Sequence, residues 1–275
     1  MIEKYLSERK KEMEKIGIIG AGNIGGAIAR GMVKHANVNP GNIIISRRKT
    51  DLLQPFAEMG LHCTNDNPEV VSASELIILA VLPGQARGVL ESIKDNLVTG
   101  KHIVASVVSA VSIHEIESVL GNSVPVVRIM PNTAVEFGES MTCLAGDDSE
   151  AVKQVESLFE PLGSTLVIKE RLMPAATILA ACGIAFFLRF IRAETQGGIQ
   201  IGFHADEAGK IAAQTAKGAA QILLSTGNHP EQEIDKVTTP MGCTIAGLNE
   251  MEHHGLSSAL IKGIITSHAG ISDLK

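Results

Sequence analysis

The chain has 275 residues, of which 45% are hydrophobic, 20% charged and 3% aromatic, and its formal net charge is −6 at pH 7. This composition excludes a mainly disordered chain. The acidic balance, without a long basic run or tryptophan, argues against nucleic-acid binding through phosphate contacts or base stacking. The length suits one to two domains with a large buried core.

Residues 1–14 are charged and lack the apolar stretch of a secretory signal, so we expect an N-terminal extension there. The cysteines lie far apart without a C-x-x-C pair, which predicts neither a disulfide framework nor a zinc site. The most apolar run, 175–188, is shorter than a membrane span, so we interpret it as a buried core helix. These features together predict a cytoplasmic protein that does not bind a membrane.

In the first half, short β-rich runs alternate with helical patterns. Strands are predicted at 15–19, 42–46, 76–81, 102–107, 124–130, 140–145 and 165–168. Helices are predicted at 24–34, 51–59, 68–73, 112–120 and 149–162. This alternation predicts a mostly parallel sheet with helices on both faces.

Beyond about Arg171 the strand signals end and apolar residues recur at helical spacing. One helix face would carry Ile211, Thr215, Ala219, Ile222 and Leu223. Gly227 would end that helix, and Pro230 and Pro240 would each open a short helix. We therefore predict an α/β fold with three parts: the extension at 1–14, a dinucleotide-binding Rossmann domain with a doubly wound sheet at 15–170, and an all-α domain at 171–275.

A glycine-rich turn follows the first predicted strand. The segment Gly20-Ala21-Gly22-Asn23-Ile24-Gly25 is a G-x-G-x-x-G motif between a strand and a helix, which is the context that a dinucleotide site requires. Gly20 permits the tight turn, Gly22 allows a pyrophosphate to approach the backbone, and Gly25 lets the helix pack on the sheet. The free N–H groups of the helix would bind the phosphates. The alternative is a glycine-rich turn without a ligand.

The end of the second predicted strand carries cations where NAD-binding sites usually carry a carboxylate. The stretch Ser46-Arg47-Arg48-Lys49 contains no acidic residue. Arginine suits a ribose 2′-phosphate, so we predict NADP(H) in preference to NAD(H). A solvated charged turn is the alternative. The third strand ends at Leu79-Ala80-Val81-Leu82-Pro83, and carboxyl ends of parallel strands bind ligands in open α/β sheets.

A second candidate site lies in the helical half, in the segment 237–248. Thr239 is a natural N-cap with Pro240 at the first helical position. The N–H groups of Met241, Gly242 and Cys243 would then be free to bind a carboxylate, with the Thr244 hydroxyl nearby. On these residues alone, an ordinary capped helix is the simpler interpretation.

The segment around this helix resembles the signature of the pyrroline-5-carboxylate reductase family, D-x-V-T-S-P-G-G-T-T-I-A-G-L. Here residues 235–248 read D-K-V-T-T-P-M-G-C-T-I-A-G-L. Further matches are the glycine-rich turn, the Leu79–Pro83 turn and the run 128–133, R-I-M-P-N-T. The resemblance covers about 15–268.

The resemblance implies an enzyme of proline biosynthesis that reduces 1-pyrroline-5-carboxylate to L-proline by hydride transfer from NADPH. It implies a helical domain that forms a homodimer, with higher assembly left open. The cofactor would contact Gly20, Gly22, Asn23, Ile24, Gly25, Ser46, Arg47, Arg48, Asn67, Ala80, Val81, Leu82 and Pro83, with Val107 and Ser109 near the nicotinamide. The imino acid would contact Glu170, Lys236, Val237, Thr239, Met241, Gly242, Cys243 and Thr244, of which Thr244 matches the reactive threonine.

We expect the substrate carboxylate on the N–H groups at the helix start, which orients the C=N bond for hydride transfer. Thr244 would orient the imine nitrogen and relay a proton to it. The histidines show no metal-ligand spacing, so no metal is expected. The weakly charged helices beyond Arg171 would bury apolar surface against a second subunit, or alternatively on the Rossmann domain.

The chain departs from the family pattern at several positions. Leu82 stands where the family has lysine, Met241 replaces the first glycine of P-G-G, and 180–185 reads A-A-C-G-I-A instead of S-G-S-G-P-A. Two alternatives follow from these departures. The chain could reduce another cyclic imine or a small carbonyl, or it could be an NADP-binding paralogue with impaired catalysis.

Overall fold

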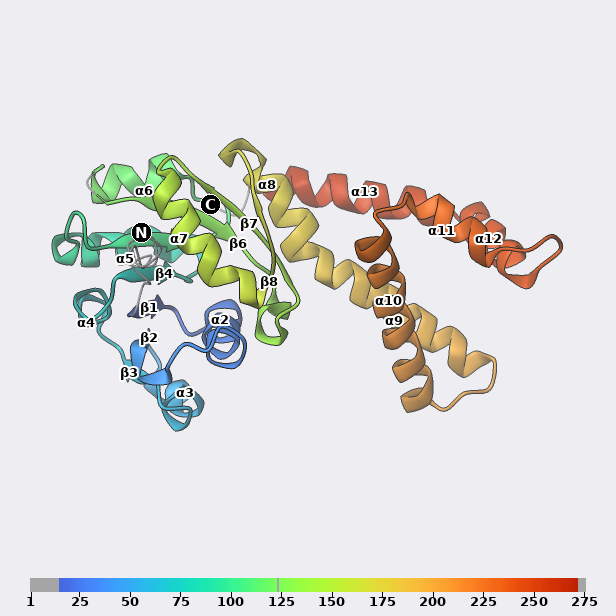
Figure 1. Cartoon of the computed structure of the whole chain (residues 1–275), viewed down its shortest axis with the longest axis horizontal. Helices are drawn as coiled ribbons and strands as arrows, with labels where there is room; N and C mark the ends of the chain where they lie inside the picture. Colours follow the sequence, from blue (N-terminus) through green and yellow to red (C-terminus); the bar gives the residue numbers. More distant parts are fainter. Residues whose placement is uncertain (1–14, 123, 272–275) are drawn as a thin grey trace, which may run out of the picture. The chain divides into compact units, whose positions relative to one another are not determined.

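The computed structural model describes residues 15–122 and 124–271, so the extension predicted at 1–14 lies outside the described residues. Eight strands form one sheet in the order β3-β2-β1-β4-β5-β6-β7-β8 (Figure 1). The strands are β1 (Ile16–Ile19), β2 (Ile43–Ser46), β3 (His62–Thr64), β4 (Leu76–Leu79), β5 (Ile103–Ser106), β6 (Val126–Met130), β7 (Ser140–Gly146) and β8 (Gly163–Val167). Those at the centre are runs of isoleucine, leucine and valine, because a sheet covered on both faces buries every side chain.

Neighbouring strands are parallel except at one pair. β7 runs antiparallel to β6, with Met130 opposite Cys143, and β8 is parallel to β7. The predicted mostly parallel, doubly wound sheet is therefore confirmed. The carboxyl ends of β1, β2, β4 and β5 meet at one edge of the sheet, and β7 ends at the opposite edge.

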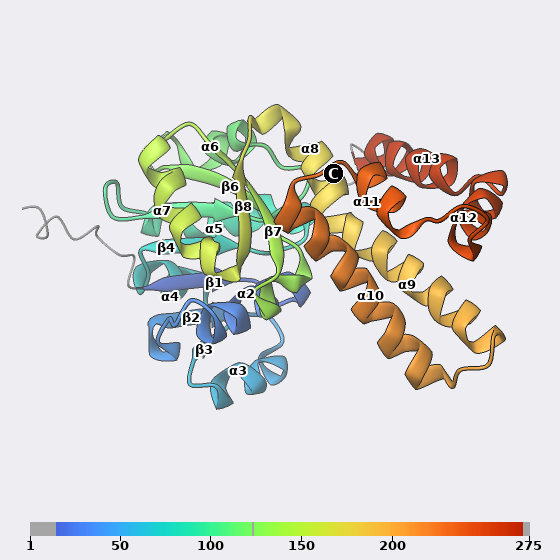
Figure 2. The same ribbon diagram turned by 45° about the vertical axis from the view of Figure 1, so that its right-hand side comes forward.

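Helices cover both faces of this sheet (Figure 2). They are α2 (Asn23–Lys34), α3 (Gln54–Glu58), α4 (Asn67–Ser72), α5 (Pro83–Ile93), α6 (Ile113–Leu120) and α7 (Ser149–Phe159). One core contains α2, α3 and α7 packed on Ile16, Ile18, Ile78 and Val127, and the other contains α4, α5 and α6 packed on Ile19, Ile77 and Leu79. Alternate residues of one strand thus enter opposite cores.

Two elements in this part were not predicted. β3 is short and polar, and α5 begins at Pro83, which we had interpreted only as a strand-ending turn. The predicted helix at 51–59 is a 3₁₀ turn, Thr50–Leu53, followed by α3. The helix predicted at 149–162 ends in a 3₁₀ turn, Glu160–Leu162.

The described residues divide into two compact units, one formed by the part of the chain up to Cys182 together with 268–271, and the other by Gly183–Ser267. The second unit is helical. It contains α9 (Gly183–Gln200), α10 (Ala205–Thr226), α11 (Pro230–Val237), α12 (Cys243–His253) and most of α13 (Leu256–Ala269). α10 ends at Gly227 with φ of +65°, and Pro230 opens α11, as predicted. Gly198 lets α9 and α10 approach, since a Cβ there would lie 2.9 Å from the Ala208 Cβ.

The apolar run 175–188 lies in a longer helical stretch than expected. Helical turns run from Glu170 to Gln200, 31 residues, through α8 (Met173–Ala176) and a π-helical turn, Thr177–Cys182. By length and composition this is the one helix in the described part of the chain that could cross a membrane, and 28% of its most apolar window is buried. The prediction of a buried core helix is therefore wrong. The helical stretch is longer than the apolar run because helical turns continue on both sides of the run, from Glu170 to Gln200.

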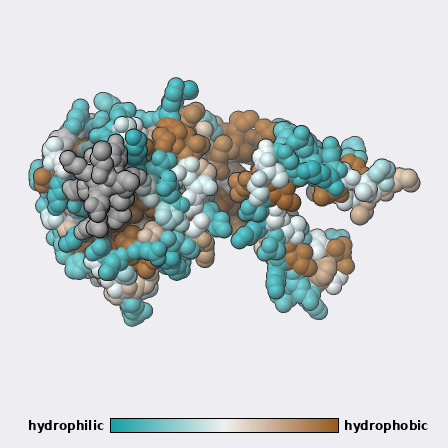
Figure 3. Space-filling view, in the orientation of Figure 1, coloured by the Kyte–Doolittle hydropathy of each residue, from teal (hydrophilic) through white to brown (hydrophobic). Residues whose placement is uncertain are grey.

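Much apolar surface remains exposed on the helical unit, as the brown areas over its helices in Figure 3 show. Only Ala208 and Ala212 are buried in α10, so the predicted apolar face of that helix is not covered by the other helices of this unit. The largest exposed apolar side chains include Phe187, Leu188, Ile201, Leu224 and Ile265. This surface is not covered within the helical unit itself, and exposed apolar surface of this kind marks an interaction site.

Candidate functional site

The glycine-rich turn connects β1 to α2, and two of its glycines are required by packing. Gly20 has φ of +110°, and a Cβ on it would collide with the carbonyl oxygen of Ala80. A Cβ on Gly25 would collide with the carbonyl oxygen of Gly20. The Gly20 and Ala21 N–H groups donate to the Ser46 carbonyl at 3.0 and 2.9 Å, which ties the turn to the end of β2.

Gly22 is different, because none of the residues that the structure describes requires it to lack a side chain. Its φ and ψ of −85° and −161° are open to any residue, and a Cβ on it would meet no atom within 4 Å. Gly22 is the N-cap of α2, so the N–H groups of the first helical turn, which includes exposed Asn23 and half-buried Ile24, face this open space. A diphosphate fits here, since it needs close approach to backbone amides and the positive end of a helix dipole.

The residues predicted at the end of β2 gather beside this turn. Ser46 is buried and its hydroxyl donates to Oδ1 of Asn67, the first residue of α4, at 2.8 Å. Arg47 donates from Nη1 to the Ala21 carbonyl at 2.7 Å, so its guanidinium lies against the glycine-rich turn. Arg48 is exposed at the same strand end. The edge therefore presents positive charge next to the proposed diphosphate position.

The ends of β4 and β5 complete the same edge. Ala80 is buried and its N–H donates to Ile19 at 2.8 Å, Leu82 is 68% exposed, and Val81 and Pro83 are half-buried. The Val107 N–H donates to the Leu79 carbonyl at 3.0 Å, and Ser109 is half-buried in the loop that follows β5. The predicted cofactor residues thus come together at the ends of four neighbouring parallel strands.

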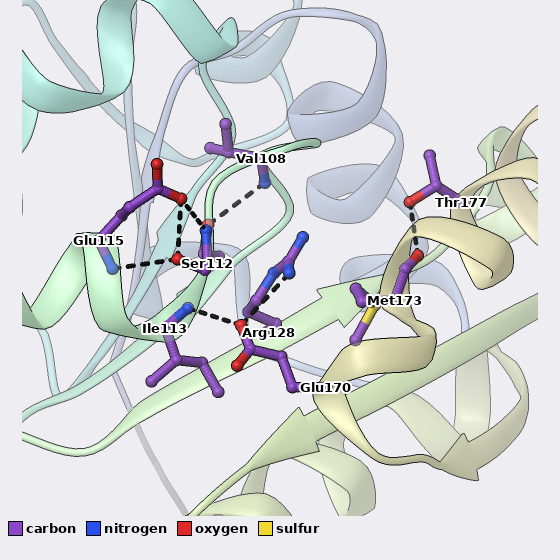
Figure 4. A network of polar contacts seen from close by, with 9 residues as sticks. Val108, Ser112, Ile113, Glu115, Arg128, Glu170, Met173 and Thr177 are labelled. Atoms are coloured by element: carbon purple, nitrogen blue, oxygen red, sulfur yellow. Dashed lines mark hydrogen bonds and ion pairs between the residues drawn. The ribbon is translucent and has the colours of Figure 1, made fainter. Parts of the chain in front are cut away.

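Glu170 lies in a network of partly buried polar contacts on this same unit (Figure 4). Its Oε1 accepts a hydrogen bond from the Ile113 N–H at 2.7 Å and lies 3.3 Å from Nη1 of Arg128. Burial lowers the pKa of Arg128, and the neighbouring Glu170 carboxylate opposes that shift. Arg128 was noted only as the start of the run 128–133 that matches the family, and the Ser112–Glu115 capping box of α6 was not predicted. The S-x-x-E spacing was the signal for the box.

The helix start predicted at Pro240 is wrong. α11 ends at Val237, Pro240 and Met241 form a turn, and α12 begins at Cys243 with Gly242 as its N-cap. The Gly242 N–H donates to the Thr239 carbonyl at 2.9 Å and so cannot join an anion site. The turn forms because Met241 adopts φ of +61°, which interrupts the helical path after Pro240.

The shifted helix start changes which amides are free. The first-turn N–H groups now belong to Cys243, Thr244 and Ile245, and Thr244 stands in the first turn rather than one turn further on. Val237 and Met241 are exposed, with Met241 at 102%. Lys236 pairs with Glu233 at 2.7 Å, and hydrogen bonds from Lys236 and Asn228 lower the pKa of Glu233.

A separate hollow of about 500 Å³ lies at the opposite edge of the sheet, lined by residues such as Glu75, His102 and Asp147. None of the predicted cofactor residues lines it, so we do not assign the dinucleotide to it. Within residues 15–122 and 124–271, no group of three or more His, Cys, Asp or Glu side chains could hold a metal ion.

Comparison with known families gives two matches along the chain. Residues 170–274 match the family model for pyrroline-5-carboxylate reductase dimerisation. Residues 15–110 match the model described as NADP oxidoreductase, coenzyme F420-dependent. The first match covers the helical half of the chain, and the second covers the part of the sheet that carries the glycine-rich turn.

Individual relatives carry the same description over nearly the whole chain. Pyrroline-5-carboxylate reductase 2 of Dictyostelium discoideum is 46% identical over 94% of this chain and 92% of its own length. Pyrroline-5-carboxylate reductase 1 of the same organism is 48% identical over 92% of this chain, which spans only 48% of that relative. The solved structure of a pyrroline-5-carboxylate reductase from Coxiella burnetii superimposes with a TM-score of 0.85 at 28% identity, over 96% of this chain and 99% of its own.

Proposed function

The chain belongs to the pyrroline-5-carboxylate reductase family, and we propose that it reduces 1-pyrroline-5-carboxylate to L-proline in proline biosynthesis. Family membership confirms the expected oxidoreductase class and does not favour the alternatives of another imine, a small carbonyl or an impaired paralogue. The observation that carries the proposal is the near-full-length match to a reductase of that name.

The N-terminal domain is an NADP-binding oxidoreductase domain, and the open space over Gly22 supports that assignment. When bound, the cofactor supplies a hydride from nicotinamide C4 to the imine carbon. Gly22 keeps the diphosphate path clear, Gly20 and Gly25 allow the turn and α2 to pack closely, and Ser46 and Asn67 fix the end of β2 beside them. Arg47 and Arg48 bind the ribose 2′-phosphate, which makes NADPH the preferred cofactor over NADH.

We assign the imino acid to the segment between Lys236 and Thr244. The substrate carboxylate accepts hydrogen bonds from the first-turn amides of α12, those of Cys243 and Thr244, where the helix dipole is positive. The Thr244 hydroxyl orients the imine nitrogen and relays the proton that the product amine needs. Val237, Thr239, Met241 and Gly242 shape the turn in front of that helix.

The helical half is a dimerisation domain, and we place its start at residue 171. A second copy covers the exposed apolar side chains of α9, α10 and α13, which include Phe187, Leu224 and Ile265. This cover also explains the long apolar helix at 170–200 in a soluble enzyme, which we assign to the cytoplasm. Light scattering should give at least twice the monomer mass at micromolar concentration, and a monomer would reject this assignment.

The function is tested by following NADPH oxidation with 1-pyrroline-5-carboxylate and with a panel of other cyclic imines and small carbonyls. We expect the highest kcat/KM with pyrroline-5-carboxylate, L-proline as the product, and a lower kcat/KM when NADH replaces NADPH. Turnover that is faster on another compound, or NADPH binding without turnover on any of them, would overturn the proposal.

A further inference from the structure

The loop between β5 and α6 is held in a strained conformation. It spans residues 107–112, and Ala110 within it has φ of +59°, a left-handed value that non-glycine residues rarely adopt. Such strain persists only where the surrounding structure determines the backbone. The contacts at both ends of the loop therefore decide how firmly it is positioned.

Local contacts fix the beginning and the end of the loop. At the beginning, the Val108 N–H donates to the Ser106 hydroxyl at 3.3 Å. At the end, the Ser112 N–H donates to Oε2 of Glu115 at 2.8 Å, and the Glu115 N–H donates to the Ser112 hydroxyl at 3.1 Å. This capping box starts α6 but leaves the N–H of Ile113, the first helical residue, without a partner inside the helix.

Glu170 provides that partner from a position 57 residues further along the chain. Its Oε1 accepts the Ile113 N–H at 2.7 Å and lies 3.3 Å from Nη1 of Arg128, as Figure 4 shows. Arg128 is only 5% exposed and lies beside Ser106 in the sheet register. Among the described residues the Arg128 Nε has no hydrogen-bond partner, and the Glu170 carboxylate is the main compensation for this buried charge.

We propose that Glu170, held in place by Arg128, is a positioning residue that fixes the loop 107–112 against the nicotinamide ring. The proposal rests on the proposed function, together with the family resemblance, which implies that Val107 and Ser109 lie near the nicotinamide. It gives Glu170 a different task from the substrate contact that the family resemblance implied. The carboxylate acts on the loop through the Ile113 amide and touches neither reacting atom.

Two substitutions of Glu170 distinguish the effect of its charge from the effect of its hydrogen bond with the Ile113 amide. Glu170→Gln keeps an oxygen that can accept the Ile113 N–H but removes the charge facing Arg128, and Glu170→Ala removes both. Glu160→Ala, at an exposed position in the same unit, is the matched control. We expect kcat to fall at least about tenfold in Glu170→Ala, since misplacing a reacting group by on the order of 1 Å can cost about 100-fold. The kcat of Glu170→Gln should lie between the kcat of Glu170→Ala and that of the wild type.

Two readouts distinguish positioning from a general loss of structure. Slower hydride transfer should raise the isotope effect on kcat with NADPH deuterated at C4, while the affinity for adenosine 2′,5′-bisphosphate, which lacks the nicotinamide, stays within about twofold of wild type. In the free enzyme, the amide of Ile113 should exchange with deuterium faster in Glu170→Ala than in Glu160→Ala, and the exchange rate in Glu170→Gln should lie between those two.

Unchanged kcat together with unchanged exchange at Ile113 would overturn the proposal, as would a rise in KM for the imino acid alone, which indicates direct substrate contact. If Glu170→Ala does not fold, the same readouts on Glu170→Gln decide. A wild-type enzyme that binds NADPH but does not turn over would refute the proposed function, whereas the exchange measurement would still test the role of Glu170 in the loop.

Discussion

Gly22 and Gly25 belong to the same motif, yet the structure predicts opposite consequences for replacing each with alanine. At Gly22 the new Cβ meets no atom within 4 Å, and its φ and ψ suit an L-residue. Reduced freedom of the unfolded chain adds about 0.4–1 kcal/mol of stability, and the poorer N-cap removes about 0.5–1 kcal/mol. The free energy of unfolding of Gly22→Ala should therefore stay within about 0.5 kcal/mol of wild type.

The same methyl group occupies the space that we assign to the diphosphate. The Kd for NADPH should rise at least tenfold in Gly22→Ala, which corresponds to about 1.4 kcal/mol. Gly25→Ala should have both a lower free energy of unfolding and a higher Kd for NADPH, because its Cβ collides with the Gly20 carbonyl oxygen. Overpacking of this kind typically costs about 1–3 kcal/mol.

Urea unfolding measures the stabilities, and fluorescence titration with NADPH measures the affinities. If Gly22→Ala bound NADPH as well as the wild type, the space above this residue would not be the diphosphate position. If both variants lost stability equally, the distinction between a packing glycine and a ligand glycine would be wrong.

Other predictions concern the two proposed binding regions and one buried histidine. Replacing Arg47 and Arg48 together by alanine should raise the Kd for NADPH about tenfold or more and leave that for NADH unchanged; equal losses for both nucleotides would contradict a 2′-phosphate contact. Thr244→Ala should lower kcat/KM about tenfold, with Thr244→Ser as the control that keeps the hydroxyl; steady-state kinetics would exclude the hydroxyl if both variants matched wild type. Met241→Gly should raise the free energy of unfolding by roughly 0.5 kcal/mol. The left-handed conformation at φ of +61° costs a non-glycine residue about 1–2 kcal/mol, which exceeds the conformational entropy of about 0.5–1 kcal/mol that glycine loses on folding. A lower free energy of unfolding in urea would argue against strain at this residue. Burial lowers the pKa of His102 from its ordinary value of 6.5, so on acidification His102 is protonated at a higher pH in the unfolded chain than in the folded protein. The free energy of unfolding should therefore fall as the pH drops below 6.5. The dependence of this free energy on pH should be weaker in His102→Gln, and an identical pH dependence would show that other groups cause it.

The sheet and its cofactor edge could be predicted because their signals are local. The strand runs at 16–19, 43–46 and 76–79 are apolar and bounded by turn residues, and the G-x-G-x-x-G motif needs only its own flanks. β3 escaped prediction because its three residues, His62–Thr64, are partly exposed and carry no apolar run. α5 escaped because two glycines, Gly84 and Gly88, dilute its helical pattern.

Other features depend on contacts that sequence spacing does not contain. The partner of the Ile113 amide comes from Glu170, far along the chain, and nothing in the spacing of the two residues predicts it. At α12, Thr239 and Pro240 are a strong helix-start pattern, but the positive φ of Met241 moved the start to Cys243. The apolar run 175–188 was expected in the core because hydrophobicity alone does not distinguish burial within a chain from burial by a second copy.

The reversal of direction at β7 provides a site for attaching the Rossmann domain to a surface away from its proposed nucleotide site. Because β7 runs opposite to β6, the turn at Gly146 and Asp147 lies on the far rim from the Gly20 turn, about 15 Å away along the strands. A biotin acceptor peptide inserted before Asp148, which caps α7, would anchor the enzyme to a sensor chip through that rim. The nucleotide-binding rim would then face the flowing solution.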